Sequence, residues 1–104
     1  MARFDVYPNP DASERRHTPY FVDVQNDFID NLETRVVLPL RREAAFGPRP
    51  ARLNPLLNVG TDAVVLDTAA IGAVPVGELR KAVGSLKAAR DDIQIALDAL
   101  FGSY

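Results

Sequence analysis

The chain contains no cysteine and only one histidine, which excludes several classes of chemistry at once. Without cysteine it has no disulfides and no thiolate nucleophile, a composition that suits a reducing cytosol. One histidine and scattered acidic residues do not supply the ligand set of a zinc site. The sequence also shows no glycine-rich phosphate loop and no motif for a serine–histidine–acid nucleophile. We therefore expect no metal, no cofactor and no catalytic residue.

Long apolar runs and a strong charge of one sign are missing too. No stretch approaches the roughly 20 apolar residues that span a bilayer, and the first residues lack the apolar run of a signal peptide. Twelve basic and 14 acidic residues give a net charge of −2, which provides no general attraction to nucleic acid or anionic membranes. The 104 residues therefore predict one soluble cytoplasmic domain, residues 1–104, with no membrane contact and no specific nucleic acid binding.

The strongest local pattern is LKAARDDIQIALDALF, residues 86–101. Its apolar side chains recur at the spacing i, i+3, i+4, i+7 and i+8 of one helix face: Ile93, Ala96, Leu97, Leu100 and Phe101. Ser85 is a candidate N-cap for this helix, and Gly102 stands where a helix commonly ends. No other segment is convincingly helical, so this face needs a sheet on which to pack.

Short segments of β composition precede the helix. Alternation of apolar and polar residues, or β-branched content, predicts five or six strands, at residues 3–7, 20–25, 35–40, 53–59, 63–67 and 68–74. The predicted fold class is mainly β with one C-terminal α-helix, as an antiparallel sheet or partly open barrel.

Prolines, glycines and loops refine this prediction. Pro39 and Pro55 argue for an edge or a bulge in their strands. Residues 60–62 predict a hairpin connection, and residues 75–84 a short helical turn that ends at Gly84. In the strand at 20–25, the period of two places Tyr20, Val22 and Val24 on one face, opposite Phe21, Asp23 and Gln25.

The run YFVDVQNDFID, residues 20–30, resembles the FVDVQ-type segment of CcdB toxins, which belong to type II toxin–antitoxin modules. Further matches follow in order along nearly the whole chain: Phe4-x-Val6-Tyr7, RVVLPL at 35–40, Asn54-Pro55 to Gly60, Val74-Pro75-Val76 and the C-terminal helix. The resemblance implies an SH3-like, partly open barrel with an accessory sheet and a C-terminal helix, associating as a two-fold homodimer.

The resemblance also implies a non-enzymatic activity. CcdB toxins bind the A subunit of DNA gyrase and trap the enzyme on cleaved DNA, and a CcdA-like antitoxin neutralises them with a disordered segment that folds on the toxin. The gyrase-binding positions carried over from the family lie in the turn after the FVDVQ strand and at the helix end: Phe28, Ile29, Asp98, Phe101, Gly102, Ser103 and Tyr104.

The chain departs from the family pattern at its end. Gyrase-poisoning members continue after the phenylalanine with Trp-Gly-Ile, whereas this chain has Gly102-Ser103-Tyr104. Gly102 lacks the ring that makes a cation–π contact with a gyrase arginine, and Tyr104 is a candidate substitute two positions later. Asp98 replaces the family asparagine. A homologue that binds antitoxin but has lost or redirected gyrase poisoning is therefore an alternative.

Exposure of the apolar candidates stays open at this point. Phe28 and Ile29 are either core plugs of the turn or contacts for a partner, and Phe101 is either partly core or a target contact.

Arginines gather in the predicted loops, with few acidic residues between them: Arg15, Arg16, Arg41, Arg42, Arg49 and Arg52. They form either a solvated rim or a docking face for an acidic antitoxin tail.

The CcdB fold is shared with the MazF/Kid ribonucleases, which leaves a second function class. RNA cleavage needs a general base, a general acid and a cation near the phosphate. His17, with Arg15, Arg16 and a carboxylate such as Asp67, is the set of side chains that would supply them.

Overall fold

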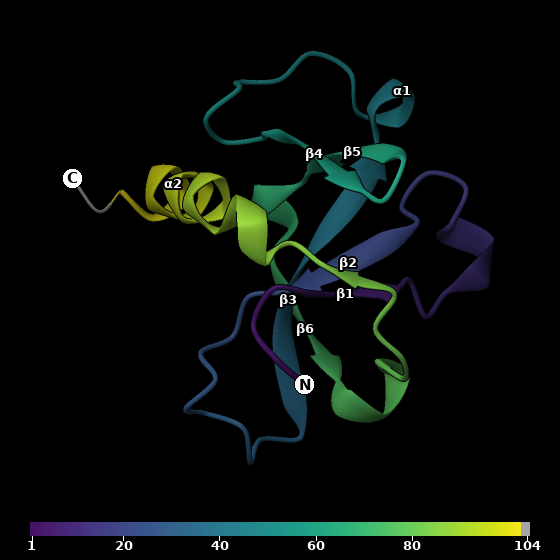
Figure 1. The fold of residues 1–104 in the computed structure, drawn as a ribbon. Helices are drawn as coiled ribbons and strands as arrows, with labels where there is room; N and C mark the ends of the chain where they lie inside the picture. The colour runs from purple at the N-terminus through teal and green to yellow at the C-terminus, as the bar shows by residue number, and fades with distance from the viewer. Residues whose placement is uncertain (103–104) are drawn as a thin grey trace.

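The protein is a nearly closed antiparallel β-barrel with one helix packed across it (Figure 1). The computed structural model describes residues 1–102. The strands are β1 (Asp5–Pro8), β2 (Tyr20–Asp23), β3 (Thr34–Arg42), β4 (Leu56–Val59), β5 (Asp62–Leu66), β6 (Gly72–Pro75) and β7 (Gly84–Ser85). The helices are α1 (Glu43–Phe46) and α2 (Arg90–Phe101), with 3-10 turns η1 (Ala12–Glu14), η2 (Thr68–Ala70), η3 (Val76–Glu78) and η4 (Lys87–Ala89).

The sheet is ordered β4-β5-β3-β2-β1-β7, and β6 pairs with β3 beside this path. The long strand β3 is central, because its first half pairs with β6 and its last three residues pair with β5. Pro39 therefore lies within a central strand, at the change of partner, and not on an edge strand. Proline has no N–H to donate, so this break in the ladder is a site that tolerates it.

The β4–β5 hairpin agrees with its prediction. Val59 pairs with Asp62, which leaves a two-residue connection, and Gly60 adopts a φ of +59° there. Pro55 precedes β4, the edge strand at one end of the sheet order.

The core lies between the barrel wall and α2. Val22 and Val24 are buried in the same cluster as Ile93, Ala96 and Leu97 of the helix. The period of two is confirmed on β2, because Tyr20 packs against this cluster whereas Phe21 packs against a second one, formed by Tyr7, Val37 and Leu79. Each large apolar side chain buried in this way stabilises the fold by about 1.5–3 kcal/mol.

The C-terminal end of α2 lies where the sequence predicts it, whereas the N-terminal end does not. Gly102 closes the helix with a φ of +71°, and its N–H donates to the Asp98 carbonyl at 2.8 Å, as a left-handed C-cap should. The start is later than expected, at Arg90, with no side-chain cap. The Ser85 hydroxyl instead accepts from the N–H of Lys87 at 3.1 Å, at the beginning of η4.

Two connecting segments differ from what the sequence suggests. The short helical turn predicted within residues 75–84 exists as η3, but it ends at Glu78, and Gly84 is paired with Val6 in the short strand β7. Residues 41–50 contain the single-turn helix α1, which sequence reasoning missed. No helix among residues 1–102 combines the length and the apolar character needed to cross a bilayer.

Candidate partner-binding surface

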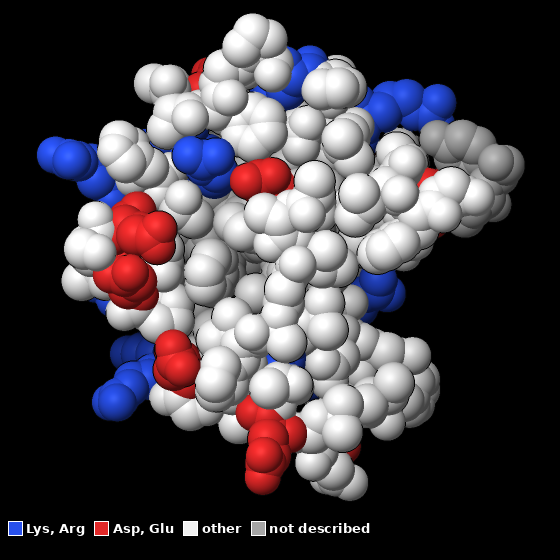
Figure 2. Space-filling view, turned by 180° about the vertical axis from the view of Figure 1, so that it is seen from behind, with Lys and Arg blue, Asp and Glu red and all other residues white. Residues whose placement is uncertain are grey.

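Two exposed phenylalanines belong to segments that lie on the same side of the molecule. Phe28 lies in the loop 24–33 and is 95% exposed, next to Ile29 at 49%. Phe101 ends α2 and is 67% exposed. The interpretation of Phe28 and Phe101 as core residues is therefore wrong. Figure 1 shows the loop and the end of α2 on the same side, and the outline in Figure 2 is indented between them, with a mostly uncharged surface.

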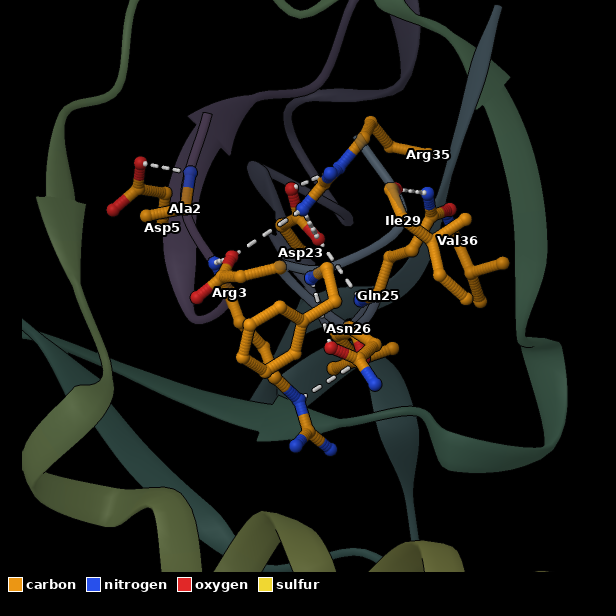
Figure 3. A network of polar contacts seen from close by, with 12 residues as sticks. Ala2, Arg3, Asp5, Asp23, Gln25, Asn26, Ile29, Arg35 and Val36 are labelled. Atoms are coloured by element: carbon orange, nitrogen blue, oxygen red, sulfur yellow. Dashed lines mark hydrogen bonds and ion pairs between the residues drawn. The ribbon is translucent and has the colours of Figure 1, made fainter. Parts of the chain in front are cut away.

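Side chains beneath the loop hold Phe28 outward. The Gln25 amide donates to the Ile29 carbonyl at 2.6 Å and accepts from the Val36 N–H at 3.0 Å (Figure 3). Asn26 closes the turn, because its side-chain oxygen accepts from the Phe28 N–H at 2.9 Å. Since these bonds satisfy the backbone of the turn from inside, the Phe28 side chain is left on the outside.

A buried ion pair anchors the start of this loop. The Arg35 guanidinium donates to both oxygens of Asp23, at 2.7 and 3.0 Å, and Arg35 is only 1% exposed. This hydrogen bonding raises the pKa of Arg35 against the lowering effect of burial. Asp23 also accepts from the Gln25 N–H at 3.0 Å, so the pair and the loop scaffold share one carboxylate (Figure 3).

Sequence reasoning missed this pair. Asp23 was placed on the correct face, but no partner was assigned to it, and Arg35 was treated only as part of the family resemblance. The signal was available, because Asp23 pairs with Val37 in the register and Arg35 lies two residues further on the same face. Opposite charges at such diagonal positions of neighbouring strands are within reach of each other.

Phe101 is exposed for a different reason. The apolar stripe of α2 is buried at Ile93, Ala96 and Leu97 and only partly buried at Leu100, and Figure 1 shows the last turn projecting away from the sheet. Asp98 lies on this turn, where its carboxylate accepts from the Gln94 side chain at 3.0 Å. The remaining candidates in the tail, Ser103 and Tyr104, lie outside the described residues.

One side chain joins the loop to the helix. The N–H of Arg3 donates to the Asp27 carboxylate at 2.7 Å, and its Nε donates to the Val24 carbonyl at 3.1 Å. Its Nη2 reaches the side-chain oxygen of Gln94 on α2, at 3.3 Å. Because Gln94 is in turn bonded to Asp98, a continuous polar chain runs from the loop to the last turn of the helix.

The predicted antitoxin-binding arginines are not all in loops, because Arg41 and Arg42 end strand β3, and most of them are engaged locally. Arg41 and Arg42 approach Asp67 and Asp62, at 3.8 and 3.3 Å. Arg49 approaches Glu43 at 3.7 Å. The Arg15 Nε donates to a backbone carbonyl at 2.6 Å. The positive charge of these loops is therefore partly balanced within the protein.

The described part of the chain shows no direct contact between His17 and the carboxylate of the ribonuclease hypothesis. His17 is exposed in the loop before β2, and its carbonyl accepts from the Arg42 N–H at 2.8 Å. No hydrogen bond or ion pair within residues 1–102 joins the His17 imidazole to Asp67, whose carboxylate faces Arg41. The same residues include no group of three or more acidic, histidine or cysteine side chains placed to hold a metal ion.

The family comparison agrees with this arrangement of barrel, loop and helix. The family model described as CcdB protein matches residues 3–102. This match covers the barrel, the loop with Phe28 and the whole of α2. The chain therefore belongs to the CcdB family, the toxins of toxin–antitoxin modules.

Proposed function

We propose that this toxin binds the A subunit of DNA gyrase and traps the gyrase–DNA cleavage complex without breaking a bond itself. The observation that carries the proposal is the exposure of Phe28 and Phe101, in segments on one side of the molecule and at positions that the family resemblance assigns to gyrase binding. Large exposed aromatic side chains mark interaction surfaces, because aromatic anchors contribute much of the free energy of protein–protein binding.

Burial of the two exposed phenylalanines would supply free energy for binding one conformational state of gyrase. Burial of each phenylalanine against a partner contributes about 1.5–3 kcal/mol. A surface complementary to the cleaved-DNA state of gyrase, and less so to its other states, increases the population of that state. Trapping therefore follows from recognition alone.

The missing tryptophan lowers the expected affinity and does not remove the surface. A cation–π contact at that position is worth about 0.5–2 kcal/mol, and Gly102 cannot make it. Phe28, almost fully exposed, gives the loop an aromatic anchor of its own beside the helix end. Asp98 offers the partner a carboxylate in place of an amide, which favours a basic residue opposite it.

Two partners complete the proposal. The family resemblance supports a homodimer, which light scattering of the purified protein tests directly. It also supports a cognate antitoxin, for which the arginine-rich loops remain the proposed docking face. If that face is used, the association rate falls as salt concentration rises, because long-range attraction between opposite charges is screened.

The function is tested with purified gyrase and supercoiled plasmid DNA. We expect the protein to cause accumulation of linear, gyrase-linked DNA, and Phe28→Ala and Phe101→Ala each to weaken this activity by about tenfold or more. Val83→Ala is the matched control, because Val83 is an exposed apolar residue, 52% accessible, outside both the loop and α2.

A transcript is added to the same reaction to separate the two function classes. Unchanged gyrase activity at saturating protein, together with cleavage of the transcript, would overturn the proposal in favour of a ribonuclease. In that case cleavage should disappear in His17→Ala.

A further inference from the structure

Phe4 adopts an unusual backbone conformation next to the partner-binding surface. Among residues 1–102 it is the only residue other than glycine with a positive φ, +76°. Residues with a Cβ rarely adopt this conformation, because the Cβ crowds the backbone. Such outliers persist only where the surroundings fix them, and they concentrate at functional sites.

The surroundings of Phe4 fix it on both sides. Its N–H donates to the Asp23 carbonyl at 2.6 Å, and its carbonyl accepts from the Leu86 N–H at 2.8 Å. Its ring is buried in the main core cluster. With Phe4 held in this way, the preceding residue, Arg3, is directed along the gap between the loop and α2 (Figure 3).

Arg3 uses three separate donors in that gap. Its backbone N–H and its Nε bond to the loop, at Asp27 and Val24, and its Nη2 bonds to Gln94 on the helix. The guanidinium also lies 4.8 Å from the centre of the Phe4 ring, which restricts its position further. The planar arginine fork bonds two acceptors at fixed angles, which the single ammonium group of lysine does not reproduce.

We propose that Arg3 is a positioning residue, which fixes the loop 24–33 and α2 relative to each other so that Phe28 and Phe101 meet a partner as one preorganised surface. The proposal rests on the proposed function for the identity of that partner. A surface that is already ordered loses less conformational entropy on binding, and therefore binds more tightly for the same contacts.

Gln94 extends the link to the helix end. Its side-chain oxygen accepts from Arg3, and its side-chain nitrogen donates to Asp98 at 3.0 Å. Both ends of the amide are therefore used, which fixes its orientation. Loss of either Arg3 or Gln94 breaks the same chain, so the two losses should not add.

The fold does not depend on this link. The Arg3 side chain is partly exposed and is not a member of the core, and the Asp23–Arg35 pair holds the start of the loop independently. An Arg3 variant should therefore fold normally and differ only in the order and affinity of the surface.

The test compares Arg3→Ala and Arg3→Lys with Arg90→Ala in the full chain. Arg90 is the matched control, because it is an exposed arginine on α2 whose side chain, among residues 1–102, donates only to the nearby Lys87 carbonyl, at 3.1 Å. Two quantities are measured: the affinity for purified gyrase A subunit, and the rate of amide hydrogen exchange in residues 26–30 of the free protein.

We expect Arg3→Ala to bind about tenfold more weakly, a typical size for the loss of one coupling between sites. Exchange in residues 26–30 should be faster, with the denaturation midpoint close to that of the wild type. Arg3→Lys should be intermediate, Arg90→Ala unchanged, and Arg3→Ala with Gln94→Ala no weaker than Arg3→Ala alone.

Wild-type affinity or wild-type exchange in Arg3→Ala would overturn the inference. If the wild-type protein itself fails to bind the gyrase subunit, the proposed target is wrong, and the exchange rates alone then decide the role of Arg3. Faster exchange in Arg3→Ala than in Arg90→Ala supports the link, and equal exchange contradicts it.

Discussion

The two halves of the candidate surface expose a phenylalanine by different physical means. In the loop, Phe28 is held out by a buried polar scaffold, in which Asp23 and Gln25 satisfy backbone groups from beneath and Arg35 pairs with Asp23. In α2, Phe101 is exposed because the helix continues past the sheet that covers its earlier turns. The loop therefore depends on specific hydrogen bonds, whereas the helix end depends only on length and register.

The largest loss of stability is expected in the loop half of the surface, when the arginine of its buried ion pair is removed. Arg35→Ala leaves the Asp23 carboxylate buried and unpaired, which should lower the free energy of unfolding by about 3–5 kcal/mol. Denaturant unfolding followed by circular dichroism measures this loss. The double variant Asp23→Leu with Arg35→Met should recover most of it, because no charge then remains buried. A double variant as unstable as Arg35→Ala would contradict the pairing.

Within α2, two substitutions sharpen the contrast between covered and uncovered turns. Ile93→Ala empties a fully buried site and should cost about 2–5 kcal/mol of stability. Phe101→Ala removes a larger side chain but should change stability by no more than about 0.5 kcal/mol, because the ring is already in water. Equal losses in thermal or denaturant unfolding would mean that Phe101 contributes to the core.

The end of α2 offers a smaller test, at the position where the family has tryptophan. Gly102→Ala should destabilise the protein by about 1 kcal/mol, because a φ of +71° is unfavourable for a residue with a Cβ. Steric crowding is not the reason, since no atom of the described residues, apart from the adjoining backbone, lies within 4 Å of the position that the Cβ would occupy. Gly102→Trp should lose similar stability but gain affinity for gyrase, and unchanged affinity would argue against a target contact there.

The smallest effect is expected at Asp62, an acid whose side chain is 37% exposed, in contrast to the buried Asp23. Tyr20 donates a hydrogen bond of 2.5 Å to Asp62 and, with Arg42, lowers the pKa of that carboxylate. A lowered pKa in the folded state stabilises the protein above the pKa of the unfolded state, about 4. This stabilisation is lost as the pH falls through the folded-state pKa. Tyr20→Phe should therefore be less stable than the wild type at pH 7, and the difference should shrink on acidification.

The sequence predicts those structural features that depend on neighbouring residues, and it fails for those that depend on residues far away in the chain. The alternation of β2, the hairpin at Gly60 and the C-cap at Gly102 are set by neighbouring residues, and each was predicted correctly. The two-residue strand β7 was not, because Gly84 is a strand residue only through its pairing with Val6, far away in the sequence.

The same distinction explains the candidate site. The helical period predicts that Phe101 lies on the same face of α2 as Leu97. It does not show that the sheet covering this face ends before Phe101. Exposure of Phe28 depends in part on the hydrogen bond that the Val36 N–H, on another strand, donates to the Gln25 side chain, and a pattern within one segment does not contain this bond. The side chains of the surface were thus identified by resemblance, whereas their exposure required the structure.

The position of Arg3 has a practical consequence for handling this toxin. Arg3 contacts the loop and Gly102 closes α2, so both residues lie beside one surface. A fluorescent protein or affinity tag fused directly before Arg3 or directly after Gly102 would therefore stand beside Phe28 or Phe101 and shield it. A protease-removable fusion is accordingly a way to produce the protein in a harmless form and release it on demand, while a label inserted at the exposed residues 47–48, in the loop at the top of Figure 1, should leave it active.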